Sequence, residues 1–346
     1  MRNKKPIIGI TMGDPTGIGP EIVVKALSIK QMYTICNPLV IGDKDVAKQA
    51  LGIAKAQNFR INPAKGVNEA IFKYGIMDIF DLANVDMTQL VHGKISAMGG
   101  KAAFESIKKV IELAIQGKVD ATVTGPIHKE ALHLAGYHYS GHTEIYADLT
   151  NTKDYAMMLI HGNFRIVHVT THVPLRDACD LIKKDRVLRT IRLSYGAMLS
   201  LGIKKPKIAV AGLNPHAGEG GLFGNEEQEE IEPAIKEARK VGIDAKGPIP
   251  PDTAFSKTRG GKYDVAIAMY HDQGHIPMKL VGFLWNEKNK EWTSIKGVNV
   301  TLGLPIIRTS VDHGVAYGKA GEGRANPESL IEAIKVAVKM IKGKNR

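Results

Sequence analysis

The sequence predicts an α/β fold with a largely parallel sheet, and two features of the chain support this class. Short apolar runs rich in β-branched residues recur and alternate with amphipathic stretches of helical period. Most of these runs are apolar at consecutive positions, which is typical of strands covered on both faces. Strand–helix alternation of this kind indicates crossover connections and a parallel sheet. Since 346 residues exceed what one small core holds, we expect two lobes.

The expected elements follow from these runs and from the turn residues between them. The segments that we interpret as strands are 5–13, 37–43, 120–126, 164–172, 206–216, 263–272 and 297–310. The segments that we interpret as helices are 98–118, 183–202, 225–242 and 326–344. Several of these helices stop at a glycine, which is a common C-terminal signal. The charged segment 286–297 predicts a surface excursion or hairpin, held to the body by Trp285 and Trp292.

The composition excludes several classes of protein. The net charge of +12 is spread along the chain among acidic residues, and aromatic residues make up only 6%, so we expect no nucleic-acid-binding surface. A surface that attracts small anions is the milder expectation. No run approaches the roughly 18 apolar residues of a membrane span, and the N-terminus lacks a signal-peptide pattern. With only Cys36 and Cys179, we expect no disulfide framework and a reducing, cytoplasmic location.

Three of the expected strands end at a histidine, and these three residues are His172, His216 and His271. In an open α/β sheet, ligands bind beyond the carboxyl ends of the parallel strands. Neutral imidazole is a common metal ligand, and a three-histidine site leaves positions open for substrate oxygens. A single histidine at a strand end is often only a hydrogen-bonded structural residue. The pattern therefore favours a metal site without excluding the structural interpretation.

Two glycine-containing turns are further candidates for binding. In SGHTE, His142 and Thr143 offer donors near a helix start, which suits an anion, although Ser140 or Thr143 can equally be an ordinary helix cap. MGDPTGIGPE, residues 12–21, follows a strand and opens a helix. Its glycines match neither the dinucleotide fingerprint nor the nucleoside-triphosphate loop, so a tight turn and a binding role stay equally open.

Lys279, Asn299 and Arg308 form the last candidate group. Arginine presents a planar fork to phosphate or carboxylate, and lysine presents a mobile point charge. Arg308 lies inside the apolar run PIIRTSV, and buried charges usually have a partner or a ligand. Lys279 belongs to AMYHDQGHIPMKL, residues 268–280, which collects more polar groups than a turn requires.

The ordered set of motifs resembles the 4-hydroxythreonine-4-phosphate dehydrogenase family from about residue 7 to about residue 320. The motifs are GDPTGIGPE, TGPIHKEAL, SGHTE, THVPL, LNPHAGEGGLFGNEE, PPDT, AMYHDQGH and VNVTLGLPIIRTSVDHG. The resemblance implies an NAD-dependent, divalent-metal-dependent cytoplasmic homodimer of pyridoxine biosynthesis, with its active site at the subunit interface. It also implies a three-layer α/β/α fold like that of the isocitrate and isopropylmalate dehydrogenases. We expect lobes of 1–138 plus 309–346, and of 139–308.

The resemblance also implies roles for individual residues. The family's metal ligands fall on His172, His216 and His271, and its substrate-binding residues fall on His142, Thr143, Lys279, Asn299 and Arg308. The segment DHGVAYGKAGEGRANP, residues 312–327, more loosely resembles the cofactor loop of the isopropylmalate dehydrogenases. By that similarity His313, Gly314 and Asn326 contact the NAD or NADP cofactor.

Two departures from the family bear on the substrate. HDQGHIP, with His275, resembles the branch acting on 4-phospho-D-threonate or 4-phospho-D-erythronate, and segment 286–297 lengthens the chain between Lys279 and Asn299.

The expected reaction oxidises a secondary alcohol and transfers hydride to NAD, and the β-keto acid product then loses carbon dioxide. Lys279 is our candidate catalytic base, with Asp272 and Asp252 as alternatives. Zn, Mg, Co, Mn or Ni suits the metal site. A metal-dependent hydrolase of a small phosphorylated substrate is the alternative function.

Overall fold

The computed structural model describes residues 5–288 and 291–344, which form two compact units. Unit 1 comprises the chain up to Thr152 together with Leu304–Ile341, and unit 2 comprises Lys153–Gly303 together with the residues from Lys342. The sequence placed the two boundaries at residues 138 and 308. The first lies later in the structure because Ile145 and Tyr146 pack into the core of unit 1.

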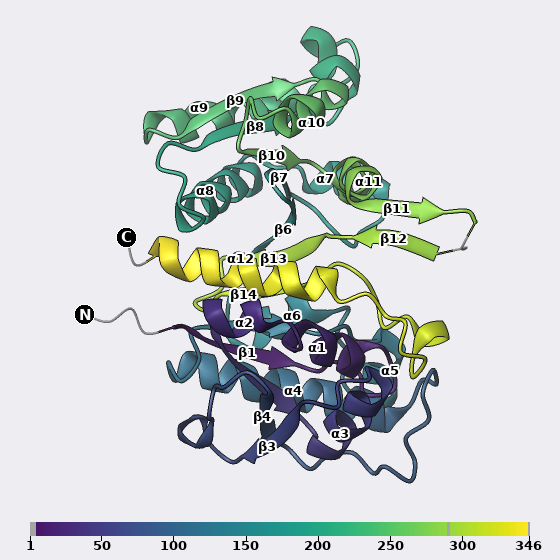
Figure 1. Ribbon diagram of the computed structural model, residues 1–346. Helices are drawn as coiled ribbons and strands as arrows, with labels where there is room; N and C mark the ends of the chain where they lie inside the picture. The colour runs from purple at the N-terminus through teal and green to yellow at the C-terminus, as the bar shows by residue number, and fades with distance from the viewer. Residues whose placement is uncertain (1–4, 289–290, 345–346) are drawn as a thin grey trace. The chain divides into compact units, whose positions relative to one another are not determined.

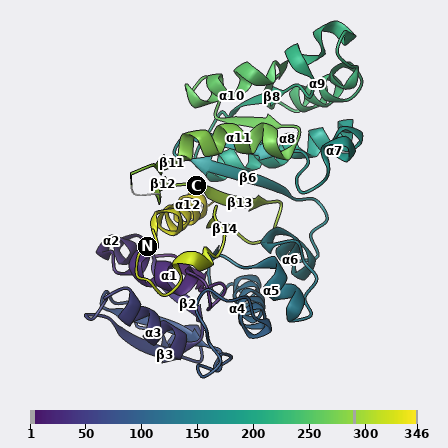
Figure 2. The same ribbon diagram turned by 90° about the vertical axis from the view of Figure 1, so that its right-hand side faces the viewer.

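Unit 1 is built on six parallel strands in the order β3-β4-β2-β1-β5-β14. Its strands are β1 (Ile7–Thr11), β2 (Asn37–Gly42), β3 (Arg60–Ala64), β4 (Ile76–Asp81), β5 (Ala121–Thr124) and β14 (Arg308–Val311). Its helices are α1 (Gly19–Leu27), α2 (Lys30–Ile35), α3 (Lys44–Ile53), α4 (Ala97–Ile115), α5 (Lys129–Leu134), α6 (His142–Leu149) and α12 (Glu328–Lys344), with short 3-10 turns at Val67–Glu69 and Tyr317–Lys319. Figure 2 shows α1 and α12 on one side of these strands and α4 on the other.

Unit 2 has a mixed sheet in the order β13-β6-β7-β10-β8-β9, antiparallel from β13 to β7 and parallel from β7 to β9. Its strands are β6 (Ala156–His161), β7 (Phe164–His168), β8 (Lys207–Ala211), β9 (Asp244–Ile249), β10 (Val265–Ala268) and β13 (Val298–Leu302). Its helices are α7 (Leu175–Leu181), α8 (Lys184–Ser200), α9 (Glu232–Lys240), α10 (Pro251–Arg259) and α11 (His271–Gly282), with a 3-10 segment at Pro215–Gly221 and a π-helical turn at Glu227–Ile231. In Figure 1, α8 and α9 cover one side of these strands and α10 and α11 the other.

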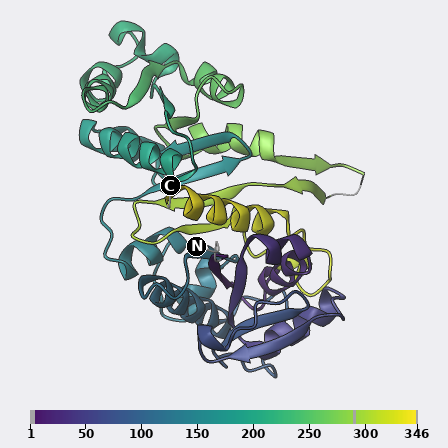
Figure 3. The same cartoon turned by 60° about the vertical axis from the view of Figure 1, so that its left-hand side comes forward.

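The predicted α/β class with three layers and a mostly parallel sheet is confirmed in both units. The predicted hairpin also exists, as β11 (Phe283–Asn286) paired antiparallel with β12 (Glu291–Ile295). Figure 3 shows these two strands running outward from the α11 end of unit 2. Trp285 is 50% exposed and donates to Glu287 within the hairpin. Because the side chain of Trp292 lies outside the described residues, the attachment of the hairpin by the two tryptophans stays a prediction.

The predicted strands were too long at their carboxyl ends. β7 ends at His168, β8 at Ala211 and β10 at Ala268. None of the three predicted histidines therefore ends a strand: His172 lies in the turn after β7, His216 in the segment Pro215–Gly221, and His271 begins α11. Beyond these ends the hydrogen bonding is irregular: the amides of Val169 and Thr170 still donate to the carbonyls of Ala268 and Met269, whereas the amide of Met269 donates to the side chain of Gln273. Within the described residues, no helix is long and apolar enough to cross a membrane.

Candidate functional site

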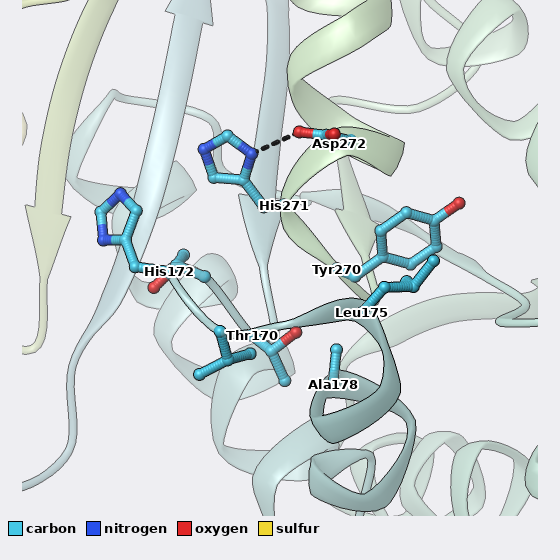
Figure 4. A pocket seen from close by; sticks show the side chains of 9 residues that line it. Thr170, His172, Leu175, Ala178, Tyr270, His271 and Asp272 are labelled. Atoms are coloured by element: carbon cyan, nitrogen blue, oxygen red, sulfur yellow. Dashed lines mark hydrogen bonds and ion pairs between the residues drawn. The ribbon is translucent and has the colours of Figure 1, made fainter.

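A pocket of about 250 Å3 opens in unit 2 beyond the ends of β7 and β10. Its wall is made by the turn that follows β7, by the first part of α7 and by the start of α11 (Figure 4). The residues that line it are Thr170, Thr171, His172, Val173, Leu175, Ala178, Tyr270, His271 and Asp272. The location agrees with the expectation that ligands bind beyond the carboxyl ends of parallel strands.

His172 and His271 lie together in this pocket, with ring centroids 5.6 Å apart and planes tilted by 45° (Figure 4). Two ligands of one ion can have this separation, since each metal–nitrogen bond is about 2.0–2.1 Å long. His271 Nδ1 is 2.6 Å from Asp272 Oδ1. Because a carboxylate only accepts, Nδ1 carries a proton, and Nε2 has the lone pair whenever the imidazole is neutral. A carboxylate behind a histidine is the usual arrangement around a metal-binding imidazole.

His216, the third predicted ligand, does not line the pocket. Its side chain is 73% exposed, and its Nδ1 lies 3.3 Å from Glu219 Oε2. Across residues 5–288 and 291–344, no three histidine, cysteine, aspartate or glutamate side chains are grouped closely enough to hold a metal ion. The structure thus brings together two of the three predicted ligands, and the complete metal site stays a prediction.

The backbone that carries His216 is strained. Residues 216–220 all have positive φ, from 42° to 79°, and three of the five are not glycine. A left-handed residue other than glycine costs roughly 1–2 kcal/mol, and strain of this kind gathers at functional sites. The buried carboxylate of Glu227 holds the start of this stretch, accepting from the amides of Leu213 at 2.7 Å and Asn214 at 2.8 Å.

His271 has two further imidazoles behind it, from His275 and His168. The His275 ring stacks on His271 with centroids 3.7 Å apart and planes 12° from parallel, and His168 lies 4.8 Å from His275. Burial, and next the neighbouring His275, lower the pKa of fully buried His168 to about 3. Gly274 leaves room for the His168 ring, because any Cβ at this position would collide with it. These imidazoles therefore form one packed group.

Unit 1 contains a different site, centred on Arg308 of β14. Arg308 is only 2% exposed and donates through Nη2 to Thr124 Oγ1 at 3.0 Å. Its Cζ lies 5.5 Å from the ring centroid of Tyr146. Burial lowers the pKa of Arg308 to about 10, against the opposite effect of Tyr146 and Glu144. The guanidinium is still cationic at neutral pH, so it suits an anionic ligand.

His142 and Thr143 open α6 in the same unit. The N-cap residue of this helix is Gly141, so the alternative in which Ser140 or Thr143 is the cap is wrong. Burial, and then the charge of Arg308, lower the pKa of His142 well below its ordinary value, which keeps the imidazole neutral. His142 Nε2 is buried and has no hydrogen-bond partner in the described part of the chain. The buried guanidinium suits a phosphate or carboxylate, and the neighbouring Nε2 of neutral His142 can accept a hydrogen bond from a hydroxyl of the same ligand.

The other predicted substrate residues belong to unit 2. Lys279 lies on α11 with its Nζ 4.0 Å from the ring centroid of Phe283. Asn299 lies in β13, where it stands opposite Leu159 of β6. The five predicted substrate residues are therefore divided between the units, with His142, Thr143 and Arg308 in unit 1.

The predicted cofactor loop, residues 312–327, is tied to the GDPTG turn of unit 1. Tyr317 Oη donates to Asp14 Oδ2 at 2.8 Å, and the other oxygen of Asp14 accepts from both the amide and the hydroxyl of Thr16. The amide of Ala325 donates to buried Glu21 at 2.7 Å. These contacts hold the loop at the carboxyl end of β1, beside residues 12–21. For those residues the sequence allowed a binding role and a tight turn equally.

The individual cofactor candidates occupy different positions in this loop. His313 Nδ1 is 2.9 Å from the carbonyl oxygen of Gly314, which is exposed. Asn326 Oδ1 accepts from the amide of Glu328 at 2.8 Å, at the start of α12. Asn326 thus has a structural role in addition to the predicted one.

Sequence reasoning assigned no role to Asp14, Tyr146, Gln273 or Tyr317. Tyr146 follows Thr143 at helical spacing, and Asp14 lies inside a motif that was singled out, so both had a local signal. Gln273 and Tyr317 also lie inside segments that were singled out, 268–280 and 312–327. Their hydrogen-bond partners are distant in sequence or are backbone atoms, so the sequence did not reveal their contacts.

Comparison with known proteins gives one consistent family. A family model described as "Pyridoxal phosphate biosynthetic protein PdxA" matches residues 34–337. A relative from Clostridium botulinum named "Putative D-threonate 4-phosphate dehydrogenase" is 48% identical over 339 residues, 98% of each chain. Crystal structures of 4-hydroxythreonine-4-phosphate dehydrogenases from Burkholderia phymatum (43% identity, TM-score 0.83) and Klebsiella pneumoniae (39%, 0.86) each cover 98% of this chain and 99% of their own.

Proposed function

Because the chain belongs to the PdxA family of pyridoxal phosphate biosynthetic proteins, we propose that it is a dehydrogenase of a phosphorylated four-carbon hydroxy acid. D-Threonate 4-phosphate is the preferred substrate, and D-erythronate 4-phosphate and 4-hydroxy-L-threonine 4-phosphate are the alternatives. The first is preferred for two reasons: the name of the relative with 48% identity, and the His275 that distinguishes this chain's HDQGH motif. No observation favours the hydrolase alternative over an oxidoreductase.

One observation carries the proposal: the buried cation of Arg308 beside the neutral imidazole of His142. A phosphate or carboxylate bound there gains charge-assisted hydrogen bonds from the guanidinium. His142 donates to the Gly125 backbone, so its Nε2 accepts from a hydroxyl or a protonated oxygen of the same ligand. The guanidinium is held in place by its hydrogen bond to Thr124 and by its contact with the ring of Tyr146. Binding energy at this remote end of the substrate positions the reacting carbon.

The reacting end of the substrate is assigned to unit 2. His172, His271 and His216 would hold a divalent ion, with Asp272 orienting His271 through its Nδ1. The ring centroids of His172 and His271 are 5.6 Å apart, and His216 would have to leave Glu219 to join them. A bound divalent ion polarises the carbon–oxygen bond of the alcohol and the ketone, and a bound NAD or NADP accepts hydride. Lys279 and Asn299 bind the substrate, and Lys279 is the candidate for removing the hydroxyl proton.

The finer parts of the proposal concern the cofactor, the product and the assembly. His313, Gly314 and Asn326 contact the nicotinamide cofactor, supported by the attachment of their loop to Asp14 and Glu21. The β-keto acid product then loses carbon dioxide, as such acids readily do. The protein is a homodimer with its active site at the subunit interface.

A substrate panel tests the proposal. Metal-free protein is supplied with NAD or NADP, one of Mg, Mn, Co, Ni or Zn, and each of the three phosphorylated acids or its unphosphorylated counterpart. We expect NADH formation only with a phosphorylated acid and an added metal ion, and carbon dioxide in equal amount. Equal rates with unphosphorylated acids would contradict the Arg308 and His142 assignment. Full rates in the presence of a strong chelator would contradict the metal.

A further inference from the structure

We infer that the Arg308–His142 site of unit 1 selects a phosphate monoester in its singly protonated form, because it pairs a fixed hydrogen-bond donor with a fixed acceptor. The inference rests on the proposed function, in which the phosphate end of the substrate binds at this site. It adds which protonation state of the phosphate is bound, and therefore how binding depends on pH and on competing anions.

The donor and the acceptor are fastened to adjacent residues at the carboxyl end of β5. Arg308 Nη2 donates to Thr124 Oγ1 at 3.0 Å, and the His142 imidazole donates to the carbonyl of Gly125. Thr124 is the last residue of β5, and Gly125 follows it. Because consecutive Cα atoms are about 3.8 Å apart, these two bonds bring the guanidinium and the imidazole close together.

Tyr146 keeps the pair in this arrangement. It follows His142 by four residues, so both lie on the same face of α6. Its ring centroid is 5.5 Å from Arg308 Cζ, and its hydroxyl donates to Thr122 Oγ1 at 3.0 Å. Arg308 stands opposite Thr122 in the parallel register of β14 with β5, and Thr122 and Thr124 share one face of that strand. One helix face and one strand face therefore fix the two groups.

The hydrogen-bonding roles of the two groups cannot be exchanged. A guanidinium has only donors. His142 uses one ring nitrogen to donate to Gly125, and its Nε2 is buried and without a hydrogen-bond partner in the described residues. Burial and the charge of Arg308 lower the His142 pKa and so oppose a second proton on the ring. A ligand therefore meets a group that only donates beside a nitrogen that only accepts.

A singly protonated phosphate monoester fits this pair. It offers two unprotonated oxygens to the fork of Arg308 and one hydroxyl to His142 Nε2. A dianionic phosphate instead turns an oxygen lone pair toward the lone pair of Nε2. It also brings a second negative charge near Glu144, whose carboxylate already acts on Arg308. Sulfate carries no proton at neutral pH and meets the same obstacle.

This selection predicts a pH dependence of binding. The second pKa of a phosphate monoester is about 6, so about half of it carries the proton at pH 6 and about 1% at pH 8. Apparent affinity should therefore fall roughly 50-fold over this interval. The other titratable groups around the described site are Arg308, with a pKa lowered to about 10, Tyr146, with a pKa raised to about 12, and Glu144. The first two do not titrate between pH 6 and pH 8, and a variant tests Glu144.

The test titrates methyl phosphate, sulfate and glycolate into the full-length chain by calorimetry at pH 6, 7 and 8. In the unaltered protein we expect the roughly 50-fold fall for methyl phosphate and, at pH 6, at least about 10-fold weaker binding of sulfate. Two buffers of different ionisation enthalpy should show about one proton taken up per methyl phosphate bound at pH 8.

Four variants assign the effect to a residue. His142→Gln replaces the fixed acceptor with an amide that can turn its donor toward the ligand, so the pH dependence and the preference over sulfate should nearly vanish. Arg308→Met should abolish binding of all three anions, and Glu144→Gln should keep the pH dependence. His161→Gln is the matched control, because His161 Nδ1 of β6 is also buried and without a partner in the described residues; it should bind like the unaltered protein.

Some outcomes overturn the selection alone. Equal affinity for methyl phosphate at pH 6 and pH 8, or equal affinity for sulfate and methyl phosphate, would mean that the dianion binds, and the proposed anion site would still stand. A pH dependence that persists in His142→Gln, or disappears in Glu144→Gln, would remove His142 as the selecting group.

Other outcomes reach the proposed function itself. If glycolate binds through Arg308 and methyl phosphate does not, the site takes the hydroxy acid end of the substrate, which overturns both the selection and the phosphate assignment. If none of the three anions binds the unaltered protein, the anion site of the proposed function fails first, and the selection fails with it.

Discussion

Replacing Arg308 with methionine separates the contribution of this residue to binding from its effect on folding. Burial lowers the Arg308 pKa from its ordinary value to about 10. One pKa unit is worth about 1.4 kcal/mol, so keeping the charge inside the ligand-free protein costs roughly 3 kcal/mol. This cost is present in full at neutral pH, since neutral pH lies below both values. It disappears only as pH rises above about 10 toward the ordinary pKa of arginine, where the unfolded chain binds more protons than the folded one.

Arg308→Met removes that cost together with its contacts, which include the hydrogen bond to Thr124 and the contact with Tyr146. A hydrogen bond from a charged group is worth about 1.5–3 kcal/mol, so the two effects nearly cancel. We therefore expect a free energy of unfolding within about 1 kcal/mol of the unaltered protein. Substrate binding should suffer much more, because two lost bonds to phosphate amount to about 3–6 kcal/mol, or about 10²–10⁴-fold in kcat/KM.

Phosphate-dependent unfolding and NADH formation measure the two effects. Inorganic phosphate at about 100 times its dissociation constant should stabilise the unaltered protein by about 2.7 kcal/mol and Arg308→Met by far less. Arg165→Met is the matched control. Arg165 is also buried, but it donates to the carbonyls of Asn163 and Asp264, so its loss should destabilise the fold and leave the phosphate response unchanged. The reasoning is refuted if Arg308→Met, like Arg165→Met, destabilises the fold and leaves the stabilisation by phosphate unchanged.

Three further substitutions test other parts of the site. His216→Ala should weaken Co2+ binding by at least about 10-fold without changing thermal stability, because the side chain is 73% exposed; an unchanged calorimetric affinity would remove His216 from the ligand set. The pKa of His142 in the folded protein is well below the 6.5 of the unfolded chain. The free energy of unfolding therefore falls as pH drops below about 6.5, by at most about 1.4 kcal/mol per pH unit for this one residue. Chemical unfolding of His142→Gln should show this pH dependence reduced, and an identical slope would contradict the pKa assignment. Tyr317→Phe loses the bond to Asp14 and should weaken NADH binding by about 1 kcal/mol, or roughly fivefold, in a fluorescence titration, while the stabilisation by phosphate stays; equal NADH affinity would separate this loop from the cofactor.

The sequence predicted the fold class and the residues of the candidate sites more reliably than it predicted how those residues are arranged. Consecutive apolar runs and helical stripes are local properties, and they identified an α/β chain with a mostly parallel sheet. An arginine inside an apolar run likewise identified Arg308 as an unusual buried charge. The ends of the strands were misplaced, because a strand ends where its hydrogen bonds pass to other groups, and those groups lie elsewhere in the chain.

What the sequence determined by itself is therefore the pattern of burial and the kinds of chemistry that the chain can perform. Only the tertiary structure decided that His142 and Arg308 share unit 1 while Lys279 and Asn299 belong to unit 2. It also decided that His172 meets His271 while His216 pairs with Glu219 on a left-handed turn. The physical reason is that hydrophobic periodicity acts over a few residues, whereas the buried bonds of Gln273, Thr170 and Tyr317 join segments that meet only when the sheets form.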